Sequence, residues 1–211
     1  MRILTLFVSC MIVVGCTPSV PTNTGVYMLL DTSGTYRIEL KKAQQIIQYT
    51  LTRLDAKDTF AVARIDTGSF SEKDIVAKAT FDDRPSMVNR QKRMFAEEIG
   101  DFVENVQSSP FTDITGGLLQ AVEFLNEKDT GIKTILIFSD LKEDLKDGYV
   151  RDITFDLDGY SVIALNVTKL RSDNVDPREY IGRLEDWQTK VEKYGGRWQV
   201  INDLDGLEGL L

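Results

Sequence analysis

Oxygen-bearing side chains occupy alternate positions where an apolar run ends near the start of the chain. The run 26–30 reads V-Y-M-L-L and is followed by Asp31, Ser33 and Thr35. A carboxylate and two hydroxyls at this spacing, where a buried strand gives way to a loop, suit a small hard cation such as Mg²⁺ better than a soft one. The segment therefore predicts part of a site for a divalent cation.

Composition narrows the classes of function. The 211 residues are 42% hydrophobic and 27% charged, which predicts one globular domain. The net charge of -8 and the pI of about 4.7 argue against a nucleic-acid partner, because phosphate binding needs a basic face. The sequence has no histidine, which excludes Ser-His-Asp and Cys-His nucleophiles and His-ligated zinc.

The first residues predict export and anchoring in a bacterial cell envelope. Residues 1–15 hold one basic residue and an apolar stretch too short to span a bilayer as an ordinary helix, as in a lipoprotein signal peptide. The sequence Val13-Val14-Gly15-Cys16 resembles a lipobox, which implies that Cys16 carries lipid such as palmitate and that residues 16–24 tether the domain to the membrane. An ordinary signal peptide or an uncleaved anchor is the alternative. Thr17 rather than Asp after the cysteine favours the outer over the inner membrane if the cell has two.

From residue 25 onward, strand-like apolar runs alternate with helical periods, as in an α/β domain. The predicted strands are 26–30, 59–65, 75–81, 134–138, 161–167 and 198–201. Apolar residues at helical spacing predict helices over 40–54, 87–106 and 114–125, and a last helix from an Asp176-Pro177 cap to Gly195-Gly196.

The connections predict a mixed sheet of six strands. Residues 66–74 are too few for a helical crossover, so the second and third strands should form an antiparallel pair at one edge. Loops at the carboxyl ends of the parallel strands converge on one crevice, where ligands usually bind. Thr112, ahead of the third helix, and Asp140, after the fourth strand, should therefore lie near Asp31.

Taken together, these residues resemble the von Willebrand factor A-type domain and its metal-ion-dependent adhesion site. The resemblance covers nearly all of 25–211 and implies a Rossmann-like, doubly wound sheet with helices on both faces. The family's Asp-x-Ser-x-Ser motif corresponds to Asp31, Ser33 and Thr35, its following threonine to Thr112, and its strand-terminal aspartate to Asp140.

The resemblance implies a docking site for a protein and no reaction. Three neutral hydroxyls and two carboxylates would hold Mg²⁺, or Mn²⁺ or Ca²⁺, and leave it electrophilic enough to take a carboxylate from an envelope or extracellular protein. Two positions depart from the family, because Phe111 and Leu141 stand where glycine is frequent. Thr115 is an alternative ligand to Thr112. The charged stretch 142–147 is typical of a solvated loop. Because it follows Asp140, it could also rim the site, and an acidic rim would disfavour strongly acidic partners.

Two other functions remain open. D-T-S-G-T also resembles the nucleophile loop of haloacid dehalogenase-like phosphatases, in which Asp31 would be phosphorylated and Asp140 and Asp144 would hold Mg²⁺. That family usually has a second aspartate where Ser33 stands. The other alternative is a structural scaffold that keeps the fold without metal. Asp66-Thr67-Gly68-Ser69 matches an aspartic protease motif, but the single copy in a short hairpin favours a turn.

Overall fold

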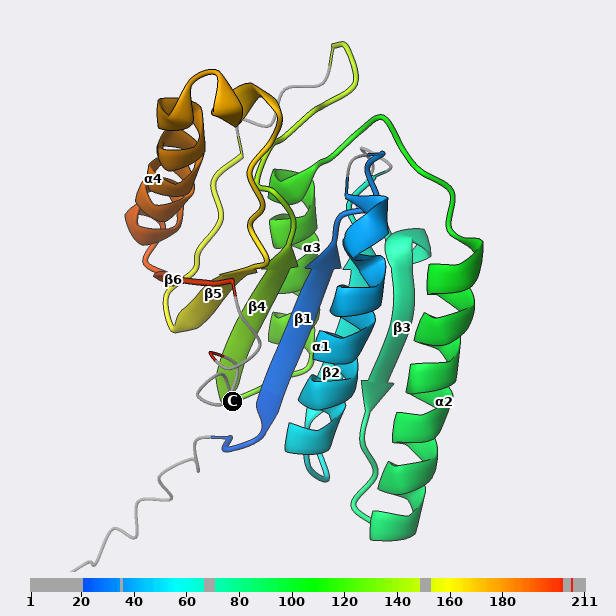
Figure 1. Ribbon diagram of the computed structural model, residues 1–211. Coiled ribbons are helices and arrows are strands. Elements are labelled where there is room, and N and C mark those ends of the chain that lie inside the picture. The colour runs from blue at the N-terminus through cyan, green and yellow to red at the C-terminus, as the bar shows by residue number, and fades with distance from the viewer. Residues whose placement is uncertain (1–20, 35, 67–70, 149–152, 203–205, 207–211) are drawn as a thin grey trace, which may run out of the picture.

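The computed structural model describes residues 21–34, 36–66, 71–148, 153–202 and 206. Its centre is a six-stranded sheet in the order β3-β2-β1-β4-β5-β6 (Figure 1). The strands are β1 (Thr24–Leu30), β2 (Thr59–Arg64), β3 (Ile75–Thr80), β4 (Ile132–Phe138), β5 (Tyr160–Leu165) and β6 (Arg197–Ile201). All neighbouring strands are parallel except β2 and β3, so the predicted antiparallel edge is confirmed.

Helices cover both faces of the sheet. The helices are α1 (Leu40–Arg53), α2 (Pro85–Asn105), α3 (Ile114–Glu127) and α4 (Pro177–Lys193). Alternate residues of β1 face opposite ways: Met28 belongs to the core beneath α1 and α2, whereas Leu29 belongs to the core beneath α3 and α4. Both faces of the central strands are therefore buried, which explains their continuous apolar runs. The predicted doubly wound α/β fold is confirmed.

The predicted elements agree with the structure to within about two residues at each end. The structure adds three short 3₁₀ segments, η1 (Arg37–Glu39), η2 (Glu72–Asp74) and η3 (Ser172–Asn174). Asp176 caps α4 as predicted, by accepting a hydrogen bond from the Arg178 amide. No helix among the described residues is long and apolar enough to cross a membrane.

The domain includes residues slightly before residue 25. The carbonyl of Asn23 accepts hydrogen bonds from the amides of Gly131 and Ile132, and the amide of Thr24 donates to Asp58 Oδ1 at 2.7 Å. These two residues, which the sequence assigns to the tether, are thus fastened to the domain. The predicted signal peptide, Cys16 and the first part of the predicted tether lie outside the described residues.

The parallel strands all end at the same edge of the sheet, and the connecting loops gather there (Figure 1). Leu30 of β1 pairs with Phe138 of β4 in register, and the amide of Asp31 continues this ladder by donating to the Phe138 carbonyl at 3.0 Å. The residues that directly follow β1 and β4 are consequently neighbours.

Candidate metal centre

Asp31 is deeply buried, with 1% of its surface exposed, compared with 3% for Thr112 and 4% for Asp140. Its carboxylate is held by neutral donors. Oδ1 accepts from the Ser33 amide at 2.8 Å, and Oδ2 accepts from the Ser139 hydroxyl at 2.7 Å. Burial raises the pKa of Asp31 above its usual value, and the bonds from Ser139 and Ser33 offset part of that rise. The site thus holds a buried carboxylate whose charge a bound cation would stabilise.

The loop after β1 is fastened to its neighbours on one side. The Thr32 hydroxyl donates to Asp66 Oδ2 at 2.8 Å, and the Thr32 carbonyl accepts from the Ser109 amide at 3.2 Å. Ser109 also donates its hydroxyl to the Asp66 carbonyl at 2.9 Å. These bonds fix the backbone on which Ser33 stands.

Thr112 reaches the site from the segment before α3. Its buried hydroxyl lies 3.4 Å from Asp31 Oδ1. Its backbone pairs with Asp144, the amide of each residue donating to the carbonyl of the other at 2.8 and 2.9 Å. The hydroxyl of Thr115, the alternative ligand, instead accepts from Lys190 of α4. Of the two threonines, Thr112 is the one whose hydroxyl faces Asp31.

Asp140 follows β4 by two residues and is 4% exposed. Its Oδ1 accepts from the Lys142 amide at 2.9 Å. Burial raises the pKa of Asp140 and the negative charge of Asp31 raises it further, whereas the Lys142 amide and the charge of Arg183 lower it. A divalent cation shared by the two carboxylates would relieve this repulsion.

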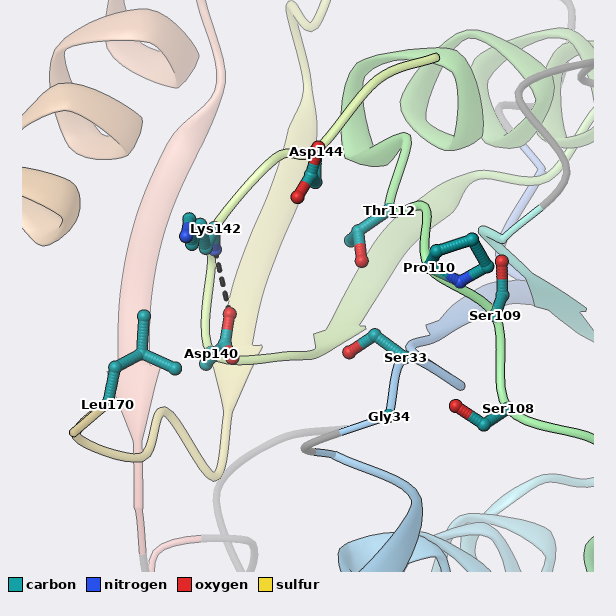
Figure 2. A pocket seen from close by; sticks show the side chains of 10 residues that line it. All are labelled: Ser33, Gly34, Ser108, Ser109, Pro110, Thr112, Asp140, Lys142, Asp144 and Leu170. Atoms are coloured by element: carbon teal, nitrogen blue, oxygen red, sulfur yellow. Dashed lines mark hydrogen bonds between the residues drawn. The ribbon is translucent and has the colours of Figure 1, made fainter. Parts of the chain in front are cut away.

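A pocket of about 570 Å³ opens over these loops (Figure 2). Figure 2 shows the hydroxyls of Ser33 and Thr112 and the carboxylate of Asp144 directed into it. Asp31 is not one of the lining residues, but its Oδ1 lies 3.4 Å from the hydroxyl of Thr112, which is. The lining residues are Ser33, Gly34, Ser108, Ser109, Pro110, Thr112, Asp140, Lys142, Asp144 and Leu170.

The structure therefore brings four predicted residues together: Asp31, Ser33, Thr112 and Asp140. Thr35 lies outside the described residues. The described residues contain no group of three or more His, Cys, Asp or Glu side chains arranged to hold a metal. The predicted ligand set contains only two carboxylates and would be completed by hydroxyls.

Sequence reasoning missed several residues that support the site. The most direct is Ser139, which bonds to the Asp31 carboxylate, and its only sequence signal is its position before Asp140. Asp66 and Glu143 act through other residues, the first through Thr32 and the second by accepting from the Thr115 amide at 2.6 Å. Both are separated from their partners by more than 25 positions, so no local pattern indicates these contacts.

Comparison of the sequence with protein-family models finds no match, and comparison with curated proteins finds none either. Solved structures do match. A von Willebrand factor type A protein from Catenulispora acidiphila aligns with a TM-score of 0.52 and 14% identity, covering 90% of this chain and 41% of that one. The pilus adhesin SpaC from Lactobacillus rhamnosus GG, in its open conformation, aligns with a TM-score of 0.54 and 11% identity, covering 90% and 29%.

The fold is of the von Willebrand factor A type. BatB from Bacteroides thetaiotaomicron, a conserved hypothetical protein, aligns with a TM-score of 0.48 and 15% identity, covering 89% of this chain and 95% of that one. The chain spans about two fifths of the Catenulispora protein and under a third of SpaC. In the A-type fold observed here, the candidate metal centre lies at the carboxyl edge of the parallel strands, where ligands of such sheets usually bind.

Proposed function

We propose that this chain is a lipid-anchored envelope protein whose A-type domain binds a protein partner through a divalent cation. Asp31, Ser33, Thr112 and Asp140, with Thr35, would hold the cation, and a carboxylate of the partner would complete its coordination. Mg²⁺ is the first choice, with Mn²⁺ or Ca²⁺ as alternatives, because every donor is an oxygen. When bound, the cation would supply positive charge for the partner's carboxylate.

One observation carries this proposal. Three loops far apart in the sequence place two buried carboxylates and two hydroxyls beside one open pocket. Among the described residues, the hydrogen bonds to Asp31 come from an amide and from hydroxyls, so dipoles rather than a cationic side chain solvate its negative charge. Burying such a charge is costly unless it is paired or coordinates a metal.

The charges that line the pocket also bear on the choice of partner. Asp140, Lys142 and Asp144 all line it. Asp144 adds negative charge beside the place a partner carboxylate would occupy, which disfavours partner segments with several acidic residues. A segment that offers one carboxylate fits this lining better.

Metal binding is tested directly by titrating Mn²⁺ into the full-length chain in detergent and following the loss of the free-ion paramagnetic resonance signal. Asp31→Asn and Thr112→Val should abolish or strongly weaken binding. Ser108→Ala is the matched control, because Ser108 lines the same pocket and is not a proposed ligand. A parent chain that binds neither Mn²⁺ nor, by calorimetry, Mg²⁺ would contradict the proposal and favour a metal-free scaffold.

Docking is tested by crosslinked capture of a partner from the envelope fraction. Capture should require the metal, stop with EDTA and be lost in Asp31→Asn. The phosphatase alternative predicts instead a beryllofluoride adduct and Asp31-dependent turnover of a phosphate ester, and we expect neither. Anchoring is tested separately by labelling with palmitate, where label retained by Cys16→Ala would refute the anchor.

A further inference from the structure

One face of α4 bonds to the loop that follows Asp140. Arg183, Trp187 and Lys190 are four and three positions apart, the spacing that aligns side chains on one side of a helix. Arg183 Nε donates to the Asp140 carbonyl at 3.3 Å, and Trp187 Nε1 donates to the Leu141 carbonyl at 2.9 Å. Two successive carbonyls of the loop are thus held by side chains of the same helix.

Lys190 extends this contact to a third element. The Glu143 Oε1 accepts from the Thr115 amide in the first turn of α3 at 2.6 Å, which satisfies one of the otherwise unpaired amides of that helix end. Lys190 Nζ lies 3.6 Å from the other Glu143 oxygen and donates to the Thr115 hydroxyl. The ammonium also lies over the Trp187 ring, 4.3 Å from its centroid. Lys190 therefore joins α4, the loop after β4 and the start of α3.

This arrangement links the two segments that carry Thr112 and Asp140. Thr112 lies two residues before α3 and pairs with Asp144 through its backbone, while Glu143 precedes Asp144 and bonds to α3. These three bonds together set the distance between the segment before α3 and the loop after β4. Because Mg²⁺ demands nearly ideal octahedral geometry, a small change in that distance should lower the affinity of the site for Mg²⁺.

We propose that Arg183, Trp187 and Lys190 of α4 are positioning residues for the metal centre, acting through the backbone after Asp140 and through Glu143. This inference rests on the proposed metal binding. Trp187 also provides a fluorescence reporter. Its indole donates a hydrogen bond to Leu141, the residue after the proposed ligand Asp140, so its emission should change when the metal binds. The chain has two tryptophans, and Trp198→Phe isolates the emission of Trp187.

The experiment compares Lys190→Met with Lys193→Met in the full-length Trp198→Phe chain. Lys193 is on the same helix and is exposed, and methionine keeps most of the aliphatic stem in both variants. Lys190→Met should weaken Mg²⁺ binding, read from Trp187 emission and from calorimetry, by about tenfold, the lower end of the range for groups outside the ligand shell. Lys193→Met should match the parent, and Lys190→Arg should recover most of the affinity because it keeps the donor and the charge.

Unchanged Mg²⁺ affinity in Lys190→Met would overturn the inference, as would an equal loss in Lys193→Met. Hydrogen exchange of the Thr115 amide provides a readout without metal. If the parent chain binds no metal, the proposed function fails. The exchange rate then tests only whether Lys190 fastens the loop after β4 to α3. Faster exchange in Lys190→Met than in Lys193→Met would support a fastening role for Lys190, and equal protection would refute it.

Discussion

The substitution Ser139→Ala should destabilise the domain far more than a serine usually does. Ser139 has no exposed surface, donates its hydroxyl to Asp31 Oδ2 at 2.7 Å and accepts from the Leu141 amide at 3.1 Å. Alanine removes both bonds and leaves a buried carboxylate oxygen and a buried amide without that partner.

The magnitude follows from these two bonds. A hydrogen bond to a charged group contributes about 1.5–3 kcal/mol, and an unsatisfied buried amide costs about 1–3 kcal/mol. Because local rearrangement recovers part of the loss, we expect about 3 kcal/mol, a large share of the roughly 5–15 kcal/mol that stabilises a typical domain. For a domain of this size that corresponds to a Tm lower by about 6–12 °C.

The assay is denaturant unfolding with EDTA present, in a double-mutant cycle with Asp31→Asn. Without the carboxylate charge, Ser139→Ala should cost about 1–2 kcal/mol less, because the charge-assisted part of the bond is already absent. Ser108→Ala is the control and should change stability by no more than about 0.5 kcal/mol, since Ser108 is exposed. A loss below about 1 kcal/mol for Ser139→Ala, or the same loss in both backgrounds, would refute the reasoning.

Two further substitutions test how the neighbouring loops are held. Leu141→Gly relieves the strain of a left-handed backbone (φ 67°) but removes a side chain that is 2% exposed. The free energy of unfolding should therefore fall by about 1–3 kcal/mol. A rise would mean that the backbone strain outweighs the lost packing. Asp173→Asn breaks a bidentate pair with Arg183 at 2.8 and 2.7 Å and should cost about 2–4 kcal/mol at neutral pH. The hydrogen bonds from Arg183 lower the pKa of Asp173 in the folded protein. The stability that the pair contributes is therefore fully present above the usual aspartate pKa and is lost as pH falls through the lower pKa of the folded state. A cost of Asp173→Asn that stays constant across the acid titration would contradict this account.

The sequence predicts the fold well because the decisive signals are local. Strand runs and helical periods depend on neighbouring residues, and the short connection 66–74 alone requires the antiparallel pair. The meeting of Asp31, Thr112 and Asp140 also follows, since the carboxyl ends of parallel strands share one edge. The contacts that hold these loops do not follow: Arg183 bonds to a carbonyl 43 positions away, and nothing in its local sequence distinguishes it from other helical arginines.

Leu141, one of the two departures from the A-type motif, shows that another residue can keep a backbone geometry typical of glycine. Glycine is frequent after the last motif aspartate, and Leu141 stands there, yet its backbone has the left-handed φ of 67° that glycine adopts most easily. For leucine this conformation costs about 1–2 kcal/mol. The cost is offset by burial of the side chain and by two backbone bonds, one from the Leu141 amide to the Ser139 hydroxyl and one to its carbonyl from Trp187.

The position before Thr112 does not share this geometry, because Phe111 is not among the described non-glycine residues with a positive φ. Phe111 replaces a frequent glycine, and its amide donates to the Ser109 hydroxyl at 3.1 Å, which holds the chain beside the loop after β1. Only at Leu141, therefore, do tertiary bonds hold a conformation that glycine would adopt by its own freedom. Leucine at position 141 therefore keeps the left-handed backbone, and we expect this geometry to become sensitive to substitution of Ser139 and Trp187, whose side chains bond to the Leu141 backbone.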